Sequence, residues 1–172
     1  PIMIPWNSTL SLHYRMIAYD TSGNMNTTVE RTVTVTDNDV PVFGTDSSDP
    51  TAYTGDDFTF GIVVTDNIAV QDVWVIYRFN SGPDQNLSLT GTGPYSAVLE
   101  MPVSILGTMT YTFFAVDASG NLESTPGITV QLLDNDRPLL RNGSAQKAYV
   151  GERFRFIVSL WDNDPNKGTV YV

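Results

Sequence analysis

The chain has 172 residues, no cysteine, one histidine and a formal net charge of −10. With 19 acidic and 9 basic residues, it lacks the basic stripe that a nucleic-acid partner requires. The lack of cysteine excludes disulfides and thiolate metal sites, and a single histidine excludes sites built from paired histidines. No apolar run approaches the roughly 20 residues that span a bilayer, so we expect no membrane insertion in this segment.

The chain repeats itself at the spacing of one small domain. Residues 14–24, an apolar strand pattern followed by a polar turn, return 97 residues later as residues 111–121. The polar segment 36–41 returns at the same spacing as residues 133–138. This spacing matches one immunoglobulin-sized domain of roughly 100 residues.

The repeat divides the chain into three parts. Residues 1–39 are predicted to be the C-terminal part of one domain, residues 40–135 a complete domain, and residues 136–172 the N-terminal part of another. We expect the first part to hold three strands and the last to hold two strands and the start of a third. The sequence therefore reads as a piece of a longer protein.

The complete domain is predicted to be all-β. Short segments rich in Val, Thr, Phe and Tyr alternate with turns of Gly, Asp, Asn, Ser and Pro, and apolar residues recur at every second position. Such alternation is typical of an antiparallel sandwich, in which one face of each sheet is buried and the other is exposed to solvent. Seven strands are predicted, near Ala52 and at residues 58–65, 73–79, 86–90, 95–101, 108–117 and 128–134.

The most specific pattern is Tyr111-x-Phe113-x-Ala115-x-Asp117-x-x-Gly120. It resembles strand F of immunoglobulin domains. The Ala-x-Asp-x-Ser-Gly-Asn turn, followed by a Thr-Val-Thr-Val-Thr-Asp-Asn strand and a proline, is similar to tandem Ig-like repeats of bacterial and archaeal cell-surface proteins and to hyalin-type repeats. The resemblance implies a tandem array of immunoglobulin-like antiparallel β-sandwiches in an extracellular setting.

This resemblance also assigns places to several side chains. Phe113 stands where the family has its cysteine, and Met16 does so in the first part, so both should point inward. Tyr111 should form a tyrosine corner, with its hydroxyl bonded to nearby backbone. Trp74 should occupy the core tryptophan position of the family.

The polar segments between the parts resemble the calcium-binding linkers of cadherin repeats. Calcium prefers six to eight oxygen ligands, mixing carboxylates, amides and carbonyls. In a sandwich, the incoming linker lies at the same end as two of the loops, so loop carboxylates should converge on linker carboxylates. The candidate calcium ligands are Asp37, Asn38, Asp39, Asp66 (with Asn67 beside it) and Asp117 at the first junction, and Asp134, Asp136, Asp162 (with Asn163 beside it) and Asp164 at the second.

A second interpretation of the same residues stays open. Asp and Asn side chains cap turns by accepting hydrogen bonds from nearby backbone N–H groups. The pairs Asp20/Asn24 and Asp117/Asn121 are placed to do so, with Gly23 and Gly120 supplying a positive φ. The Asp-Arg-Glu motif of cadherins is also missing.

No catalytic constellation emerges, and we expect no enzyme activity. His13 lacks a partner at a predictable position, and an edge loop gives the acidic residues of segment 46–57 no cleft in which to act. Four Asn-x-Ser/Thr sequons fit a glycosylated, exported chain. They are Asn7, Asn26, Asn86 and Asn142.

The sequence thus predicts a structural or adhesive tandem-repeat segment of a large extracellular surface protein, such as a spacer, a stalk, or a component of a surface layer or filament. Its expected partners are neighbouring Ig-like domains of the same long chain or of adjacent protomers, and a cell-surface protein or glycan. The alternative is a carbohydrate-binding accessory module of an exported enzyme, which requires a solvent-facing aromatic platform on one sheet.

Overall fold

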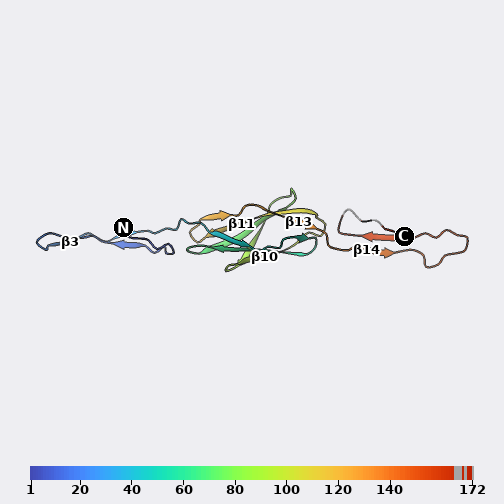
Figure 1. The fold of residues 1–172 in the computed structure, drawn as a ribbon, viewed down its shortest axis with the longest axis horizontal. Coiled ribbons are helices and arrows are strands. Elements are labelled where there is room, and N and C mark those ends of the chain that lie inside the picture. Colours follow the sequence, from blue (N-terminus) through green and yellow to red (C-terminus); the bar gives the residue numbers. More distant parts are fainter. Residues whose placement is uncertain (165–167, 169, 172) are drawn as a thin grey trace.

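The chain is all-β, as predicted. The computed structural model describes residues 1–164, 168, 170 and 171, and every regular element in this part of the chain is a strand. No helix within it is long and apolar enough to cross a membrane. The molecule is elongated, with hairpins at both ends and a curled sheet between them (Figure 1).

The N-terminal hairpins share their register with the middle of the chain. Strand β1 (Leu12–Tyr14) pairs with β4 (Arg31–Val33), and β2 (Ile17–Tyr19) pairs with β3 (Met25–Thr27). Each strand pair recurs 97 residues later in the same register: the pair Leu12↔Val33, for example, corresponds to Met109↔Val130. The repeat in sequence is therefore also a repeat in strand pairing.

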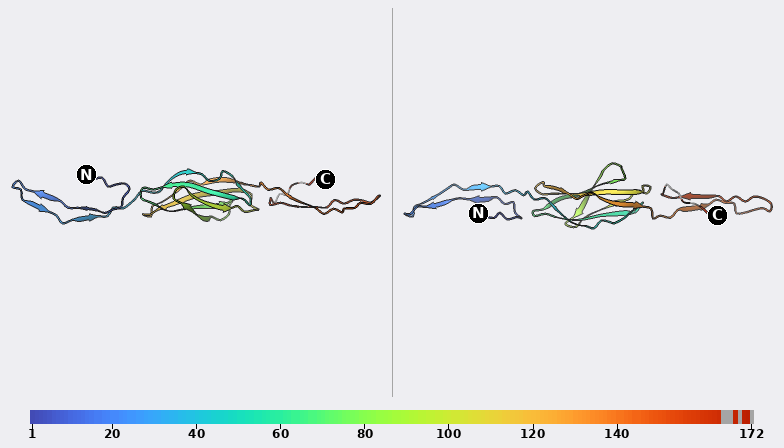
Figure 2. Two further views of the ribbon diagram at one scale, coloured as in Figure 1. Left: turned by 90° about the horizontal axis from the view of Figure 1, so that it is seen from below. Right: turned by 45° about the horizontal axis from the view of Figure 1, so that its top comes forward.

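One strongly curled sheet, which we call the middle unit, occupies the centre of the chain (Figure 2). Its order is β5-β7-β10-β9-β8-β11-β13-β6, with β12 paired to β11. Its strands are β5 (Val42–Asp46), β6 (Ala52–Tyr53), β7 (Asp57–Thr65), β8 (Val70–Phe79), β9 (Gln85–Gly91), β10 (Tyr95–Glu100), β11 (Gly107–Asp117), β12 (Leu122–Ser124) and β13 (Ile128–Leu133).

This arrangement differs from the predicted pair of separate antiparallel sheets. Strand β9 pairs along its length with β8 and at its end with β10, so it joins what would otherwise be two sheets. The edge strand β6 pairs with β13 in parallel, whereas the other pairs in this sheet are antiparallel. The short strands β5 and β12 were not predicted, since neither shows a clear apolar alternation.

At the C-terminal end, β14 (Leu139–Asn142) pairs with β15 (Val158–Trp161). The expected start of a third strand, beyond residue 164, falls mostly outside the described residues. Both ends of the molecule leave large apolar side chains exposed, such as Trp6 (73%) and Trp161 (65%).

The core forms where apolar residues alternate on the central strands. In β11, every second residue from Met109 to Asp117 is buried, and β7 buries Phe58, Phe60, Ile62 and Val64. Phe113 is fully buried, which confirms its inward position. The rings of Phe60 and Phe113 meet edge to face at 6.2 Å, a favoured geometry for aromatic pairs.

Two side chains that should point inward do not. Trp74 lies on the outer face of β8, because its neighbours Val73 and Val75 are the buried ones, and it stacks on Phe114 at 5.6 Å. Met16 is 64% exposed, since no described strand covers its face of the N-terminal hairpin. Strand alternation, not family position, determines where Trp74 points.

The turns at residues 20–24 and 117–121 have the same internal hydrogen bonds, which confirms that they are capped. Asp20 Oδ1 accepts from the backbone N–H groups of Ser22 and Asn24, and Asp20 Oδ2 accepts from the Asn24 side chain at 2.7 Å. Asp117 accepts from Ser119 and Asn121 in the same way. Gly23 and Gly120 have φ values of 87° and 92°.

Tyr111 forms a long-range bond instead of the predicted tyrosine corner. Its hydroxyl donates to Asp46 Oδ2 at 3.1 Å, joining β11 to β5. Burial, together with the charge of Asp46, raises the pKa of Tyr111 to about 12 from an ordinary value of 10.0. The stability of the middle unit should therefore depend on pH in the alkaline range where Tyr111 loses its proton.

We expect the middle unit to lose stability as the pH rises from 10.0 toward about 12. A phenol whose pKa is higher in the folded state contributes stability that is complete below its unfolded pKa and lost above it. Urea unfolding across this range should show the loss of stability in the wild type and a smaller loss in Tyr111→Phe. Some loss should remain in the variant because burial also raises the pKa of Tyr77. Parallel pH profiles for the two proteins would contradict this expectation.

Candidate metal site at the first junction

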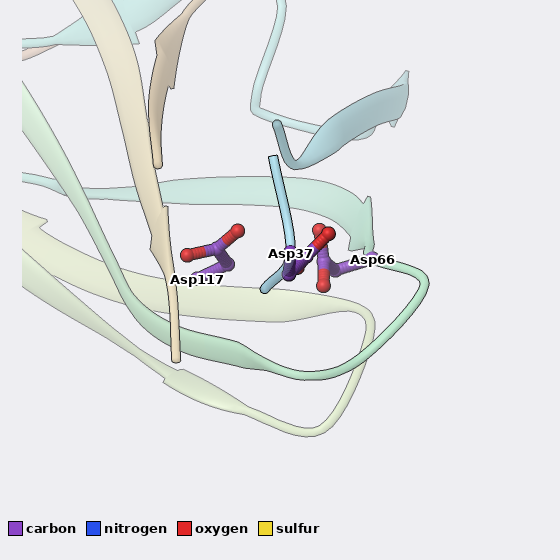
Figure 3. Close-up of side chains that lie close together, drawn as sticks. All are labelled: Asp37, Asp66 and Asp117. Carbon is purple, nitrogen blue, oxygen red and sulfur yellow. The ribbon is translucent and has the colours of Figure 1, made fainter. Parts of the chain in front are cut away.

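Three carboxylates from separate segments meet where the N-terminal hairpins join the middle unit. Asp37 lies in the linker after β4, Asp66 directly follows β7, and Asp117 is the last residue of β11. One oxygen from each lies within 4.8 Å of the others (Figure 3). This end of the middle unit, with the linker that enters it, is here called the first junction.

Local turns hold Asp66 and Asp37 in place. Asp66 Oδ1 accepts hydrogen bonds from the backbone N–H groups of Ile68 at 2.8 Å and Ala69 at 3.0 Å. Asp37 Oδ1 accepts from the backbone of Asp39 at 3.2 Å and from Asn67 Nδ2 at 3.1 Å. In both side chains, one oxygen is thus used by the protein and the other remains.

Asp117 is the buried member of the group. Its side chain is fully enclosed and accepts hydrogen bonds from the backbone of Ser119 and Asn121 and from Asn121 Nδ2. Burial acts to raise the pKa of Asp117, but the bonds from Asn121 and the turn backbone outweigh it and hold the pKa below its ordinary value. The carboxylate is therefore negatively charged at neutral pH.

Three buried oxygens at this junction have no hydrogen-bond donor among the described residues. They are Asp37 Oδ2, Asp66 Oδ2 and Asn67 Oδ1. A buried acceptor without a partner costs free energy, so such groups in folded proteins point to a water or an ion. Neither ion pair of the described residues involves Asp37, Asp66 or Asp117, so no lysine or arginine there compensates their charge.

Carboxylate and amide oxygens in this combination suit a hard divalent cation, above all calcium. The cation would lie between the linker and the two strand ends, and it would relieve the repulsion among the carboxylates. The three carboxylates therefore form a candidate cation site between two segments of the chain.

The same junction contains hydrogen bonds between the parts of the chain. Asn67 Nδ2 donates to the Trp6 carbonyl at 2.8 Å, and Asn121 Nδ2 is 3.4 Å from the Asp37 carbonyl oxygen. A pocket of about 360 Å³ opens beside them between the N-terminal residues and the linker. Asn67 thus contacts both the linker and the preceding part of the chain.

The structure separates the predicted ligands of the first junction into two groups. Asp37, Asp66 and Asp117 come together, whereas Asn38 and Asp39 are exposed and line the pocket. Asn67 was noted beside Asp66 but not counted among the ligands. The sequence signal that could have identified Asn67 was the recurrence of Asp66-Asn67 as Asp162-Asn163, 96 residues later.

The second junction is organised differently. Asn163 Nδ2 donates to Asp136 Oδ2 at 2.8 Å and to Thr54 Oγ1 at 2.9 Å, while its own Oδ1 is buried without a donor. Asp134 Oδ1 accepts from the Asp136 backbone, and Asp162 Oδ1 accepts from the Asp164 backbone. Within the described residues, no three acidic side chains converge here as they do at the first junction.

All four sequon asparagines, Asn7, Asn26, Asn86 and Asn142, are exposed. No protein-family model and no curated protein sequence matches the chain. The functional argument therefore depends on the geometry of this molecule.

Proposed function

We propose that the chain is a structural segment of a large extracellular surface protein, built from tandem immunoglobulin-like domains, with calcium stiffening its first junction. The observation that carries the proposal is the convergence of Asp37, Asp66 and Asp117, from three separate segments, at the point where one unit meets the next. A cation bound there would restrict bending between the units, as a spacer or stalk requires.

The strand arrangement supports the tandem interpretation. The pairing of β11 with β13 and β12 recurs in the N-terminal hairpins, and β14–β15 recurs as the counterpart of β5–β7. The order β5-β7-β10 on one side and β8-β11-β13 on the other fits an immunoglobulin-like sandwich in which β9 bridges the two faces. On this basis, we assign residues 1–39, 40–135 and 136–172 to successive domains.

Calcium should raise the melting temperature of the full chain by at least about 5 °C relative to chelator. Ligand at 100 times its dissociation constant stabilises a native state by about 2.7 kcal/mol, and 1 kcal/mol shifts the melting temperature of a domain this size by roughly 4–8 °C. Small-angle X-ray scattering with and without calcium should show a narrower range of conformations when calcium is bound. The two measurements test binding and stiffening separately.

The matched variants are Asp66→Asn and Asp57→Asn. Both remove one negative charge from β7 or its end, but Asp66 belongs to the site and Asp57 is exposed at the opposite end of the strand. Asp66→Asn should abolish most of the calcium shift, and Asp57→Asn should retain it. No shift in the wild type at millimolar calcium, or equal shifts in the two variants, would refute the metal site.

The second candidate function is a carbohydrate-binding module. It is favoured by the stacked pair Trp74 and Phe114, whose rings lie 5.6 Å apart on the outer face of the sheet. Binding of free oligosaccharide to the unglycosylated chain, measured by calorimetry, would support this function.

A further inference from the structure

An apolar patch lies on the outer face of the middle unit beside one of the sequons. Because Val73, Val75 and Tyr77 point into the core, Trp74 and Ile76 face outward on β8. In the pairing of β8 with β11, Trp74 lies opposite Phe114. The three residues Trp74, Ile76 and Phe114 are here called the outer patch.

Asn86 and Ser88, the two recognition residues of a sequon, border this patch. In the pairing of β8 with β9, Asn86 lies opposite Ile76 and Ser88 lies opposite Trp74. Both are exposed, while Leu87 between them is turned toward the core. Directly opposed residues in a sheet lie about 4.5–5.5 Å apart at Cβ, and diagonal neighbours about 7–8 Å apart. A sugar attached to Asn86 Nδ2 would therefore begin directly above Ile76 and within reach of Trp74.

The polar rim of the patch suits the same ligand. A shallow pocket of about 190 Å³ is lined by Ile76, the residue opposite Asn86, by Thr112 and Phe114, and by the ion pair of Arg78 and Asp84, whose atoms lie 3.4 Å apart. Ligand sites commonly combine an apolar floor with a few polar groups that fix orientation. A pyranose ring offers both counterparts, with C–H groups that pack on aromatic faces and hydroxyls that bond the rim.

We infer that Asn86 carries an N-linked glycan whose first sugar residues cover the outer patch and contact its rim. The inference rests on the proposed function in one respect, since attachment requires export. In the attachment step, Asn86 Nδ2 attacks the anomeric carbon of a lipid-linked oligosaccharide diphosphate. A C–N bond forms, the C–O bond to the diphosphate breaks, the lipid diphosphate leaves, and the amide proton passes to a base of the transferring enzyme.

The position of Asn86 distinguishes it from the other sequon asparagines in the described residues. Asn26 Oδ1 and Asn142 Oδ1 accept hydrogen bonds from the backbone of Thr27 and Ser144, which hold those side chains close to their own turns. Asn7 precedes the first strand. Of the four, only Asn86 lies on a sheet face next to a stacked aromatic pair.

The test compares the full chain secreted by glycosylating eukaryotic cells with the chain made in the bacterial cytosol. Ser88→Ala removes the sequon while keeping Asn86, and Thr9→Ala removes the Asn7 sequon as a matched control. Peptide mass spectrometry should find Asn86 occupied in the secreted protein. There, Ser88→Ala should lower the melting temperature by roughly 4–8 °C, the scale of one aromatic contact in a domain this size. In the bacterial protein Ser88→Ala should cause no shift, and Thr9→Ala should cause none in either host.

Trp74→Thr tests contact with the patch and should reduce the difference in melting temperature between the two hosts. An unoccupied Asn86 in the secreted chain, equal Ser88→Ala shifts in both hosts, or an undiminished host difference in Trp74→Thr would each overturn the inference. Chitobiose that binds the bacterial chain while Asn86 stays unoccupied would assign the patch to foreign glycans instead. Calcium binding is measured on the bacterial chain, so failure of this inference and failure of the metal site are distinguishable.

Discussion

Phe113→Ala should lower the free energy of unfolding of the middle unit by about 3–5 kcal/mol, the range for truncating a buried phenylalanine. Phe113 is fully enclosed, and its ring meets Phe60 at 6.2 Å and Tyr111 at 5.4 Å, both edge to face. Removing the ring leaves a cavity at the centre of this cluster, and the surrounding strands cannot collapse to fill it. Urea unfolding followed by circular dichroism measures the loss.

The neighbouring residue supplies the control. Phe114→Ala removes the same side chain one position along β11, but Phe114 lies on the outer face, half-buried against Trp74. We expect a loss of about 1 kcal/mol, because an aromatic pair at a partly exposed position contributes on that scale. Equal losses for the two variants would show that the sheet does not enclose its core on the Phe113 side as described.

A loss of about 3–5 kcal/mol is large beside the stability of a typical domain, about 5–15 kcal/mol. Core packing has to supply that stability, because the chain contains no cysteine and therefore no disulfide. Among the described residues, sixteen buried apolar side chains from the inner faces of both halves of the curled sheet form a single cluster. The variant should therefore also lower the yield of folded protein.

The all-β fold could be predicted because alternation at every second residue reports burial directly. β7 and β11 show this pattern over most of their length, and their buried apolar side chains are those that the pattern indicated, whereas Gly61 of β7 is buried although the pattern placed it on the other face. Trp74 shows the limit of family analogy: the resemblance placed it in the core, whereas the alternation of Val73, Val75 and Tyr77 indicates the outer face. The joining of the two faces by β9 depends on two pairings of one strand, which no local pattern encodes.

The candidate site could be predicted in part. Asp37, Asp66 and Asp117 were named from the expectation that a linker and two loops share one end of a sandwich, and the structure brings their oxygens within 4.8 Å of one another. The role of Asn67 could not be read in the same way, since its amide contacts the carbonyl of Trp6, 61 residues away. Pairings over such distances depend on how consecutive units dock, which composition and spacing do not report.

Turn capping and cation binding, the two interpretations of the acidic residues, are compatible in the structure. Asp66 and Asp37 each use Oδ1 for backbone or amide bonds and leave Oδ2 buried without a donor. Capping therefore fixes the orientation of each carboxylate and leaves one oxygen of each for an ion. A site preorganised by its own turns loses less entropy when it binds an ion.

Asp117→Ala should lower the melting temperature of the middle unit by roughly 10 °C and abolish the calcium shift. The substitution removes the acceptor for two backbone N–H groups of the turn, at Ser119 and Asn121, and one of the three carboxylates of the site. Because its pKa is lowered in the folded state, the Asp117 carboxylate contributes stability that is complete above its ordinary pKa of 3.8 and lost as the pH falls below it. Thermal unfolding at neutral and acidic pH measures both effects.

Asp20→Ala is the internal control for this substitution. Asp20 makes the same three hydrogen bonds to Ser22 and Asn24, in a turn of the same geometry, but it is exposed. Its turn joins β2 to β3, and β3 lies at the end of the molecule away from the middle unit (Figure 1). Asp20→Ala should leave the melting temperature and the calcium shift of the middle unit unchanged, while hydrogen exchange at Ser22 and Asn24 accelerates. The difference between the two variants then isolates what burial and the neighbouring carboxylates add to a shared turn. If both variants destabilised the middle unit equally, Asp117 would have no role at the junction beyond its own turn.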